Sequence, residues 1–347
     1  MKRIISLILV AVMAVALLAS CGETTTTTGA KYALVTKAAG NAYNEKEAEG
    51  FKAAMEAAGL TSSDYIIRHP EQATVEAQIA VINSLISQGV KSIAIAANDP
   101  NALSSVLADA KAKGIKILTL DSDVAPADRL TFCNQAGVQQ VAQALIDAVL
   151  DLAGGEGDYA ILSATSQATN QNAWIDAMKA IAAADSAKYG KLNLVEVAYG
   201  DDEPQKSTDQ TQALLQKYPD LKVICAPTTV GVAAAAKVLQ DKKSTVKLTG
   251  LGLPSEMAEY IGNDADHSCP YMFLWNPIDL GKLAAYASIA LVDGKITGAV
   301  GDKFEAGNME NSPYTLTAVE GTNASEIILG APFKFDPSNI GEWKSVY

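Results

Sequence analysis

Polar and small side chains follow most of the short apolar runs in this 347-residue chain. Lys37, Tyr43 and Asn44 come after the first run, and later runs are followed by Asn98 and Asp121. In open parallel sheets, ligands bind beyond the carboxyl ends of the strands, so these residues are candidates for one binding crevice. Ammonium, amide and carboxylate groups in one crevice suit a small neutral ligand with several hydroxyl groups.

The second half of the chain repeats this arrangement with amide, hydroxyl and aromatic groups. The candidates there are Asn170, Gln171, Pro227, Thr229 and Trp275. The aromatic rings of Tyr43 and Trp275 could stack on the apolar face of such a ligand.

Several of these polar residues also have a purely structural interpretation. Asn98, Asp99, Thr228 and Thr229 stand just before predicted helices, where capping alone would explain them. Asp121 and Asp123 repel one another at a strand end unless a partner such as a polyol bridges them. For Trp174, one turn into a predicted helix, core packing is the favoured interpretation.

The sequence does not indicate an enzyme. Its two histidines, His69 and His267, have no cysteine or second histidine at metal-ligand spacing. It has no phosphate-binding loop or nucleophile elbow, and residues 250–255 lack the third glycine of a dinucleotide loop. We therefore expect no catalytic residue, no metal and no cofactor.

The amino terminus has the features of an export signal. Lys2 and Arg3 precede residues 4–19, which are apolar apart from Ser6. This run is shorter than the roughly 20 residues of a spanning helix, so residues 1–20 are predicted to be a cleaved signal peptide. The sequence ending in Cys21 resembles a bacterial lipoprotein box, which implies lipid attachment at Cys21. Residues 21–30, rich in threonine, are predicted to be a flexible tether.

The charge balance argues against nucleic acid as a partner. The 27 Lys and Arg against 39 Asp and Glu give a net charge of −12. Loss of Lys2 and Arg3 leaves 25 basic against 39 acidic residues, or −14. This charge repels phosphate backbones and anionic membranes. We therefore expect an exported protein held at the outer face of the cell membrane by its lipid alone.

Three cysteines remain beyond the signal. Cys225 lies in an apolar run and is predicted to be a small buried thiol. The spacing gives no argument for a bridge between Cys133 and Cys269, and that pairing stays open.

Apolar runs alternate with segments of helical period along the rest of the chain. The predicted strands are 32–36, 65–67, 92–96, 115–120, 158–163, 192–198, 222–226, 246–250 and 270–275. The predicted helices are 45–58, 75–88, 101–113, 170–184, 205–217, 230–240, 255–262 and 278–292. Such spacing is typical of βαβ units, so the fold class is α/β with two similar lobes built on parallel, doubly wound sheets.

This layout, with the lipoprotein box, resembles the type I periplasmic-binding-protein fold of the solute receptors of bacterial ABC importers. The segments 169–174, 226–231 and 275–281 resemble the branch of rhamnose-binding proteins and autoinducer-2 receptors of the Lsr type. The resemblance implies a monomer that closes about a hinge on its ligand and delivers it to a permease and its ATPase. It implies a first lobe of 31–134 plus about 276–312, and a second lobe of 135–275 plus about 313–347. A sensor without transport is the less favoured alternative.

The resemblance also implies roles for individual residues. Autoinducer-2 receptors hold their ligand with a lysine, a strand-end aspartate, an Asp-Gln pair and a Pro-x-Ala turn. The matching residues here are Lys37, Asp121, Gln171 and Pro227. Asn170 replaces the family aspartate and Thr229 the alanine, and both changes move toward the rhamnose-binding pattern. The expected ligand is autoinducer-2, with L-rhamnose or a related deoxyhexose a nearly equal alternative.

Overall fold

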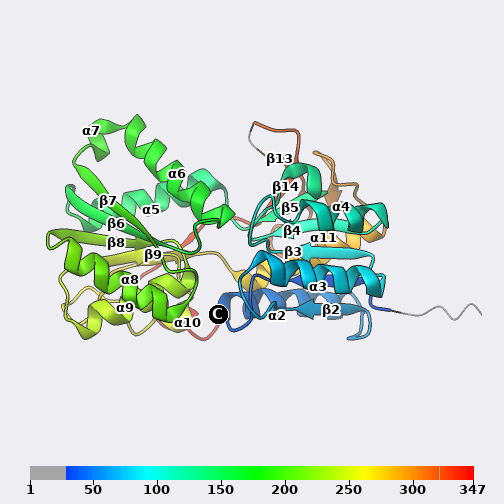
Figure 1. Ribbon diagram of the computed structural model, residues 1–347, viewed down its shortest axis with the longest axis horizontal. Helices are drawn as coiled ribbons and strands as arrows, with labels where there is room; N and C mark the ends of the chain where they lie inside the picture. Colours follow the sequence, from blue (N-terminus) through cyan, green and yellow to red (C-terminus); the bar gives the residue numbers. More distant parts are fainter. Residues whose placement is uncertain (1–28, 320) are drawn as a thin grey trace, which may run out of the picture.

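The computed structural model describes residues 29–319 and 321–347, which form two α/β lobes joined end to end (Figure 1). The first lobe has a seven-stranded sheet in the order β13-β14-β5-β4-β3-β1-β2, parallel except for β13. The second has a four-stranded parallel sheet in the order β7-β6-β8-β9 and an antiparallel pair, β10 and β15. The predicted fold class is confirmed.

The first lobe contains the following elements: β1 (Tyr32–Val35), α2 (Ala42–Ala57), β2 (Tyr65–Arg68), α3 (Val75–Gln88), β3 (Ser92–Ile95), α4 (Ser104–Ala112), β4 (Lys116–Leu120), the 3₁₀ turn η1 (Pro126–Asp128), β5 (Thr131–Asn134), α11 (Pro277–Val292), β11 (Lys303–Phe304), β12 (Tyr314–Thr315), β13 (Thr317–Ala318) and β14 (Ser325–Ile328).

The second lobe contains the remaining elements: α5 (Val138–Leu152), β6 (Gly157–Ser163), α6 (Thr169–Ala184), α7 (Ser186–Tyr189), β7 (Leu192–Tyr199), α8 (Pro204–Lys217), β8 (Leu221–Ala226), α9 (Thr229–Asp241), β9 (Lys247–Gly250), α10 (Pro254–Met257), β10 (Met272–Leu274), β15 (Phe333–Phe335) and α12 (Ile340–Trp343).

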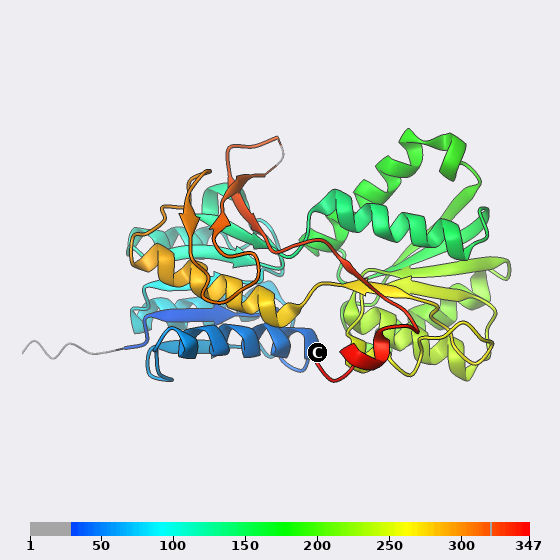
Figure 2. The same cartoon turned by 180° about the vertical axis from the view of Figure 1, so that it is seen from behind.

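Three segments of chain cross between the lobes: β5 to α5, β10 to α11, and β14 to β15 (Figure 2). The last crossing corrects the predicted lobe boundary at residue 312. Strand β14 pairs in parallel with β5, Ile327 opposite Cys133, so the chain stays in the first lobe until Ile328. The first-lobe segment after β10 therefore runs from about 276 to 328.

Two other expectations need correction. Strand β5 and helix α5 were not predicted, although α5 buries an apolar stripe that includes Val141, Leu145 and Val149. The predicted helix 255–262 is also wrong beyond Met257. There the chain turns and Ile261 forms a β-bridge with Cys269, whose amide donates to the carbonyl of Tyr260 at 3.0 Å.

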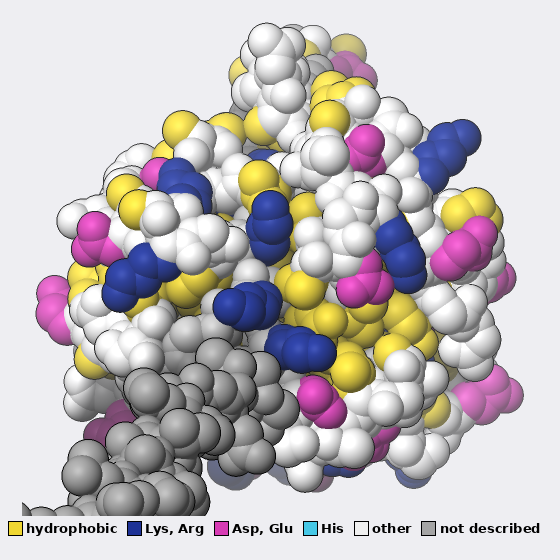
Figure 3. Space-filling model, turned by 90° about the vertical axis from the view of Figure 1, so that its right-hand side faces the viewer, with side chains coloured by type: hydrophobic (Ala, Val, Ile, Leu, Met, Phe, Trp, Pro, Cys, Tyr) yellow, Lys and Arg dark blue, Asp and Glu magenta, His cyan; other side chains and the backbone are white. Residues whose placement is uncertain are grey.

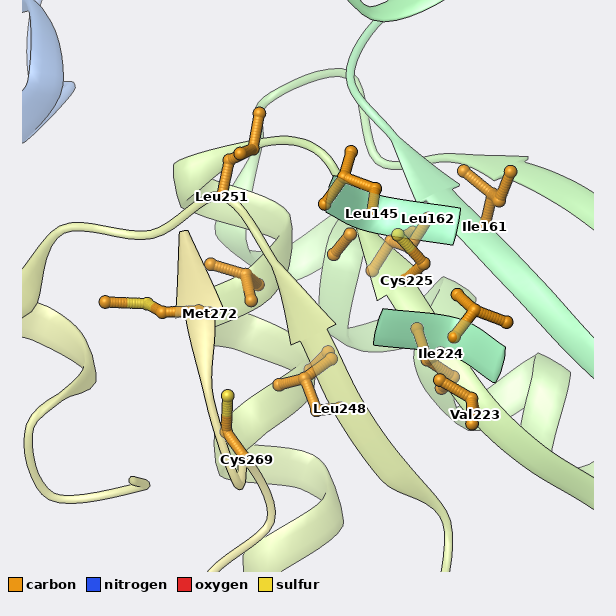
Figure 4. Close-up of a cluster of buried hydrophobic side chains, with 14 of the residues drawn as sticks. Leu145, Ile161, Leu162, Val223, Ile224, Cys225, Leu248, Leu251, Cys269 and Met272 are labelled. Carbon is orange, nitrogen blue, oxygen red and sulfur yellow. The ribbon is translucent and has the colours of Figure 1, made fainter. Parts of the chain in front are cut away.

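Buried aliphatic side chains fill the space between each sheet and its helices, and Figure 4 shows part of the second-lobe core. Cys225 and Cys269 lie inside this core, and Cys133 is buried in the first lobe. The prediction for Cys225 is confirmed. All three are free thiols in the structure, so Cys133 and Cys269 are not bridged. Burial raises the pKa of Cys225 to about 12, which keeps it protonated and unreactive.

Helices α2 and α11 pack closely against one face of the first-lobe sheet, and two glycines permit this contact. A Cβ atom on Gly281 would lie 1.9 Å from the carbonyl oxygen of Glu47, and one on Gly50 would lie 1.8 Å from that of Ile278. These distances leave no room for a side chain. The packing matters for the site because α2 begins beside the crevice and α11 begins at a crossing between the lobes.

We predict that Gly281→Ala lowers the free energy of unfolding by about 1–3 kcal/mol, the usual cost of overpacking a core. Urea denaturation measures it. Gly341→Ala is the matched control, because no atom lies within 4 Å of its Cβ position. It should change stability by less than about 0.5 kcal/mol. Equal midpoints for Gly281→Ala and the parent would contradict this account of the packing.

Candidate functional site

The carboxyl ends of both parallel sheets face one cavity between the lobes, with about 380 Å³ of unfilled space. That space includes open solvent, and the part of it that admits a water-sized molecule is about 40 Å³. The lining residues are Lys37, Asn41, Tyr43, Asn44, Asp121, Asn170, Gln171, Trp174, Asp202, Pro227, Thr228, Thr229, Leu251, Leu274 and Trp275. The structure thus brings together every predicted ligand-binding residue except Asn98.

An ion pair between Lys37 and Asp121 forms the first-lobe side of the cavity. Lys37 Nζ lies 3.0 Å from Asp121 Oδ2, and the two side chains are only 12% and 5% exposed. Burial alone would lower the pKa of Lys37, but Asp121 and then Asp202 raise it above its ordinary value. Asp121 has a left-handed backbone (φ 57°), which turns the chain sharply after β4. The pair presents a positive donor and a negative acceptor to a ligand.

Asn170, at the start of α6 in the second lobe, connects to this ion pair across the cleft. Its Oδ1 accepts from Lys37 Nζ at 3.3 Å and from the Ser122 hydroxyl at 2.9 Å. Its Nδ2 donates to Asp121 Oδ1 at 3.3 Å. One amide therefore links both charged groups of the opposite lobe. A ligand hydroxyl, which both donates and accepts, could replace each of these bonds.

Aromatic rings form the wall beside the ion pair. Trp275 Nε1 donates to the hydroxyl of Tyr43 at 2.6 Å, and that hydroxyl donates to Asp121 Oδ1 at 3.3 Å. Trp174 packs against Trp275 with ring centroids 5.6 Å apart. Trp174 is 2% exposed and belongs to the second-lobe core, which confirms its predicted packing role, yet it also lines the cavity.

Gln171 supplies an unused acceptor. Its side chain lines the cavity, and its Oε1 is buried with no hydrogen-bond partner in the structure. Buried polar atoms in proteins are nearly always paired, so an unpaired one in a cavity indicates a place where a ligand or water donates a hydrogen bond.

Asp202 is a cavity residue that the sequence analysis missed. It follows β7 and has a left-handed backbone (φ 54°), as does Asp201. Its carboxylate accepts from the hydroxyl of Thr228. Burial raises the pKa of Asp202, and Lys37 opposes that rise. The strand-end rule could have found it, because Asp202 stands just beyond the carboxyl end of a second-lobe strand.

The structure gives other roles to several strand-end residues. Asn98 lies outside the cavity lining and donates to the backbone carbonyl of Lys37 at 3.0 Å, so it supports the loop that carries Lys37. Asp99 has a structural role, but it accepts from two backbone amides of its own turn and does not cap α4, whose N-cap is Leu103. Asp123 does not need a ligand to offset its charge, because Arg129 binds it through two nitrogens at 2.8 and 2.5 Å.

Glu47 of α2 is a second residue that the sequence did not reveal. Its side chain is fully buried, and neither carboxyl oxygen has a hydrogen-bond partner in the structure. Burial raises its pKa well above the ordinary 4.5; Asp121 adds to this rise and Lys37 opposes it. The raised pKa favours the neutral form of this carboxyl, which would add no third charge to the Lys37–Asp121 pair.

We predict that stability falls with pH because of Glu47. Its folded-state pKa lies above the unfolded value of 4.5. The unfolded chain therefore gives up this proton first, and the free energy of unfolding falls as pH rises from about 4.5 to the folded-state pKa. The slope is at most about 1.36 kcal/mol per pH unit.

Urea denaturation from pH 5 to about 8 tests this linkage. Glu47→Gln should remove the slope that Glu47 contributes, whereas Glu49→Gln, at an exposed position of the same helix, should retain it. The same pH dependence in Glu47→Gln and the parent would show that Glu47 is not a buried neutral acid.

Comparison with protein families matches residues 32–296 to the family described as periplasmic binding protein domain. Among solved structures, an ABC transporter solute binding protein from Clostridium phytofermentas with bound L-rhamnose is 59% identical, covers 92% of this chain and 99% of its own, and has a TM-score of 0.88. A sugar ABC transporter from Actinomyces odontolyticus is 39% identical, with 92% and 98% coverage and a TM-score of 0.70.

LsrB from Clostridium saccharobutylicum in complex with AI-2 is 20% identical, with 90% and 99% coverage and a TM-score of 0.80, which is a likeness of fold. Among residues 29–319 and 321–347, no helix combines the length and apolar content needed to cross a membrane. The same part of the chain has no group of three or more His, Cys, Asp or Glu side chains arranged to hold a metal ion.

Proposed function

The chain belongs to the periplasmic binding protein domain family, and we propose that it is the solute-binding protein of an ABC importer for L-rhamnose or a related deoxyhexose. The observation that carries the ligand assignment is the 59% identity, over 92% of this chain, with a protein that holds L-rhamnose. The polar cavity between the lobes supports the same assignment, because it offers donors and acceptors suited to an uncharged sugar.

The chemistry of the cavity matches the two kinds of surface on a deoxyhexose. Sugar hydroxyls would bind the Lys37–Asp121 pair, Asn170 and Gln171, while the C–H face would lie against the indoles of Trp174 and Trp275. The methyl group that distinguishes a 6-deoxyhexose needs an apolar contact, which Leu251 and Leu274 of the lining could supply. A pentose has no methyl group to make this contact.

Autoinducer-2, the ligand preferred from the sequence, is less well supported than its alternative. The structure that holds it shares only 20% identity with this chain, so it supports the fold and not the ligand. Asn170 and Thr229, which replace residues of the autoinducer-2 receptors, also favour the rhamnose alternative.

We infer a binding cycle driven by closure of the lobes. In the open form the first-lobe ion pair and the second-lobe amides are separated, and ligand that contacts both sets favours the closed form. The three crossing segments would act as the hinge. The closed form is then the one recognised by the permease with its ATPase, and no catalytic step is required of this chain.

The ligand is tested by titration calorimetry and by a thermal-shift panel of L-rhamnose, L-fucose, ribose and autoinducer-2. L-rhamnose should raise the melting temperature most, because ligand that binds only the folded state stabilises it by mass action. A larger shift with autoinducer-2 would restore the first expectation. No shift with any of the four would reject the assignment.

Asp121→Asn should weaken L-rhamnose binding by about 1.5–3 kcal/mol, the value of a hydrogen bond to a charged group. The loss follows because an amide oxygen can accept from the ammonium of Lys37 but carries no negative charge to pair with it. Asp99→Asn is the matched control, since Asp99 follows the neighbouring strand β3 and does not line the cavity. Equal affinity of Asp121→Asn and the parent would exclude Asp121 from the site.

We also propose that Cys21, which lies outside the described residues, carries the lipid that holds the protein at the membrane. Cys21→Ser should move the protein from the membrane fraction to the soluble fraction or leave it unprocessed, while Cys225→Ser should stay lipid-bound. Metabolic labelling with a fatty acid followed by fractionation distinguishes these outcomes. Label on the Cys21→Ser protein would contradict the proposal.

A further inference from the structure

The end of the first lobe that points away from the cavity carries a row of lysines. Lys31 and Lys91 precede β1 and β3, and Lys116 begins β4. These strands are neighbours, so the amide of Lys91 donates to the carbonyl of Lys31 at 2.6 Å, and that of Lys116 to the carbonyl of Lys91 at 2.8 Å. Lys113 follows the end of α4. We call these four exposed residues the lysine row.

The lysine row has little negative charge beside it. The salt bridges in the described part of the chain do not include any of the four residues. Other lysines near this end do form salt bridges: Lys52–Glu56, Lys111–Asp128 and Lys295–Asp293. Asp64 lies near Lys31 and accepts from the amide and hydroxyl of Thr61, and Asp293 near Tyr32 is paired with Lys295. This end is therefore locally basic in an otherwise acidic protein.

The surface at this end shows the same feature. In Figure 3, which faces the right-hand end of Figure 1, Lys and Arg side chains gather near the middle of the face, beside an area of hydrophobic atoms. The loop from α11 to β11 contributes an exposed apolar side chain, Val300, which is 49% exposed. Basic groups next to exposed apolar atoms are typical of surfaces that contact membranes.

The chain itself places this surface near its anchor. The described residues begin at Gly29, and Lys31 is ten residues after Cys21 in the sequence. A fully extended chain of that length spans at most about 35 Å. The end that carries the lysine row is thus the part of the folded protein that the tether holds closest to the lipid.

We infer that, while the protein is not engaged with its permease, the lysine row docks on anionic phospholipid headgroups and holds the first lobe upright on the membrane, with the cavity facing away. The net charge of the whole molecule does not prevent this, because screening limits the interaction to charges within about 10 Å of the surface. Each basic residue near an anionic leaflet adds to the attraction. The inference rests on the proposed anchor at Cys21 for proximity, and it concerns orientation rather than ligand binding.

Lysine acetylation, read by mass spectrometry, tests the orientation of the lipidated full-length mature protein on vesicles. Vesicles of phosphatidylglycerol and phosphatidylcholine are compared with phosphatidylcholine alone. On the anionic vesicles at about 0.1 M salt, where the screening length is about 10 Å, acetylation of the lysine row should slow severalfold. The protection should disappear at about 1 M salt, where that length falls to about 3 Å. Lys242 and Lys243, at the far end of the second lobe after α9, should react equally throughout.

Charge-removing variants separate docking from simple crowding by the membrane. In the triple variant Lys31→Gln/Lys91→Gln/Lys116→Gln, Lys113 should lose its protection from acetylation. In the control variant Lys242→Gln/Lys243→Gln, Lys113 should stay protected. Both variants should bind L-rhamnose as the parent does. Equal acetylation on the two kinds of vesicle, or protection that survives high salt or the triple substitution, would overturn the proposal. Protein that does not co-float with either kind of vesicle would show that it is not held at the membrane, and this result would also overturn the proposal.

Discussion

The buried ion pair between Lys37 and Asp121 is the interaction on which the rest of the site depends. Two charges are largely removed from water here, which is costly unless each has partners that satisfy it. Asp121 has them in Lys37, Tyr43 and Asn170, and Lys37 has Asp121 and Asn170. Part of this shell comes from the second lobe. The pair is therefore best satisfied only when the lobes meet, or when a ligand takes the place of the opposing amide.

The architecture around the pair follows from that requirement. Parallel strands bring all their carboxyl ends to one edge, so two such sheets placed edge to edge surround a single cleft with polar loops. Close packing of α2 on α11 keeps the first-lobe side rigid, with the buried Glu47 beneath it. In the binding cycle proposed here, the three crossings let the second lobe move as a unit. Rigid half-sites on a movable frame are what a receptor needs to close on a small sugar.

The site residues that could be predicted from the sequence are those whose position depends on a few neighbouring residues. The residues that could not be assigned are those whose role depends on partners far away in the sequence. Lys37, Asp121 and Asn170 follow from strand ends and helix starts, which are visible in a few residues. Asn98 could not be assigned in this way, because its role depends on the Lys37 loop and on Gln78 of α3. The role of Asp123 depends on Arg129. Likewise, β14 is a four-residue strand whose place is set by pairing with β5, nearly two hundred residues earlier.

A crystal structure of the chain grown with L-rhamnose tests the central claim most directly. The account predicts one sugar between the lobes, with hydroxyls bound to Lys37, Asp121, Asn170 and Gln171 and its methyl group against Leu251 or Leu274. The direct bonds from Asn170 to Lys37 and Asp121 should then be replaced by bonds to the sugar. A sugar bound elsewhere, or an interlobe cavity with no sugar at a saturating concentration, would contradict it.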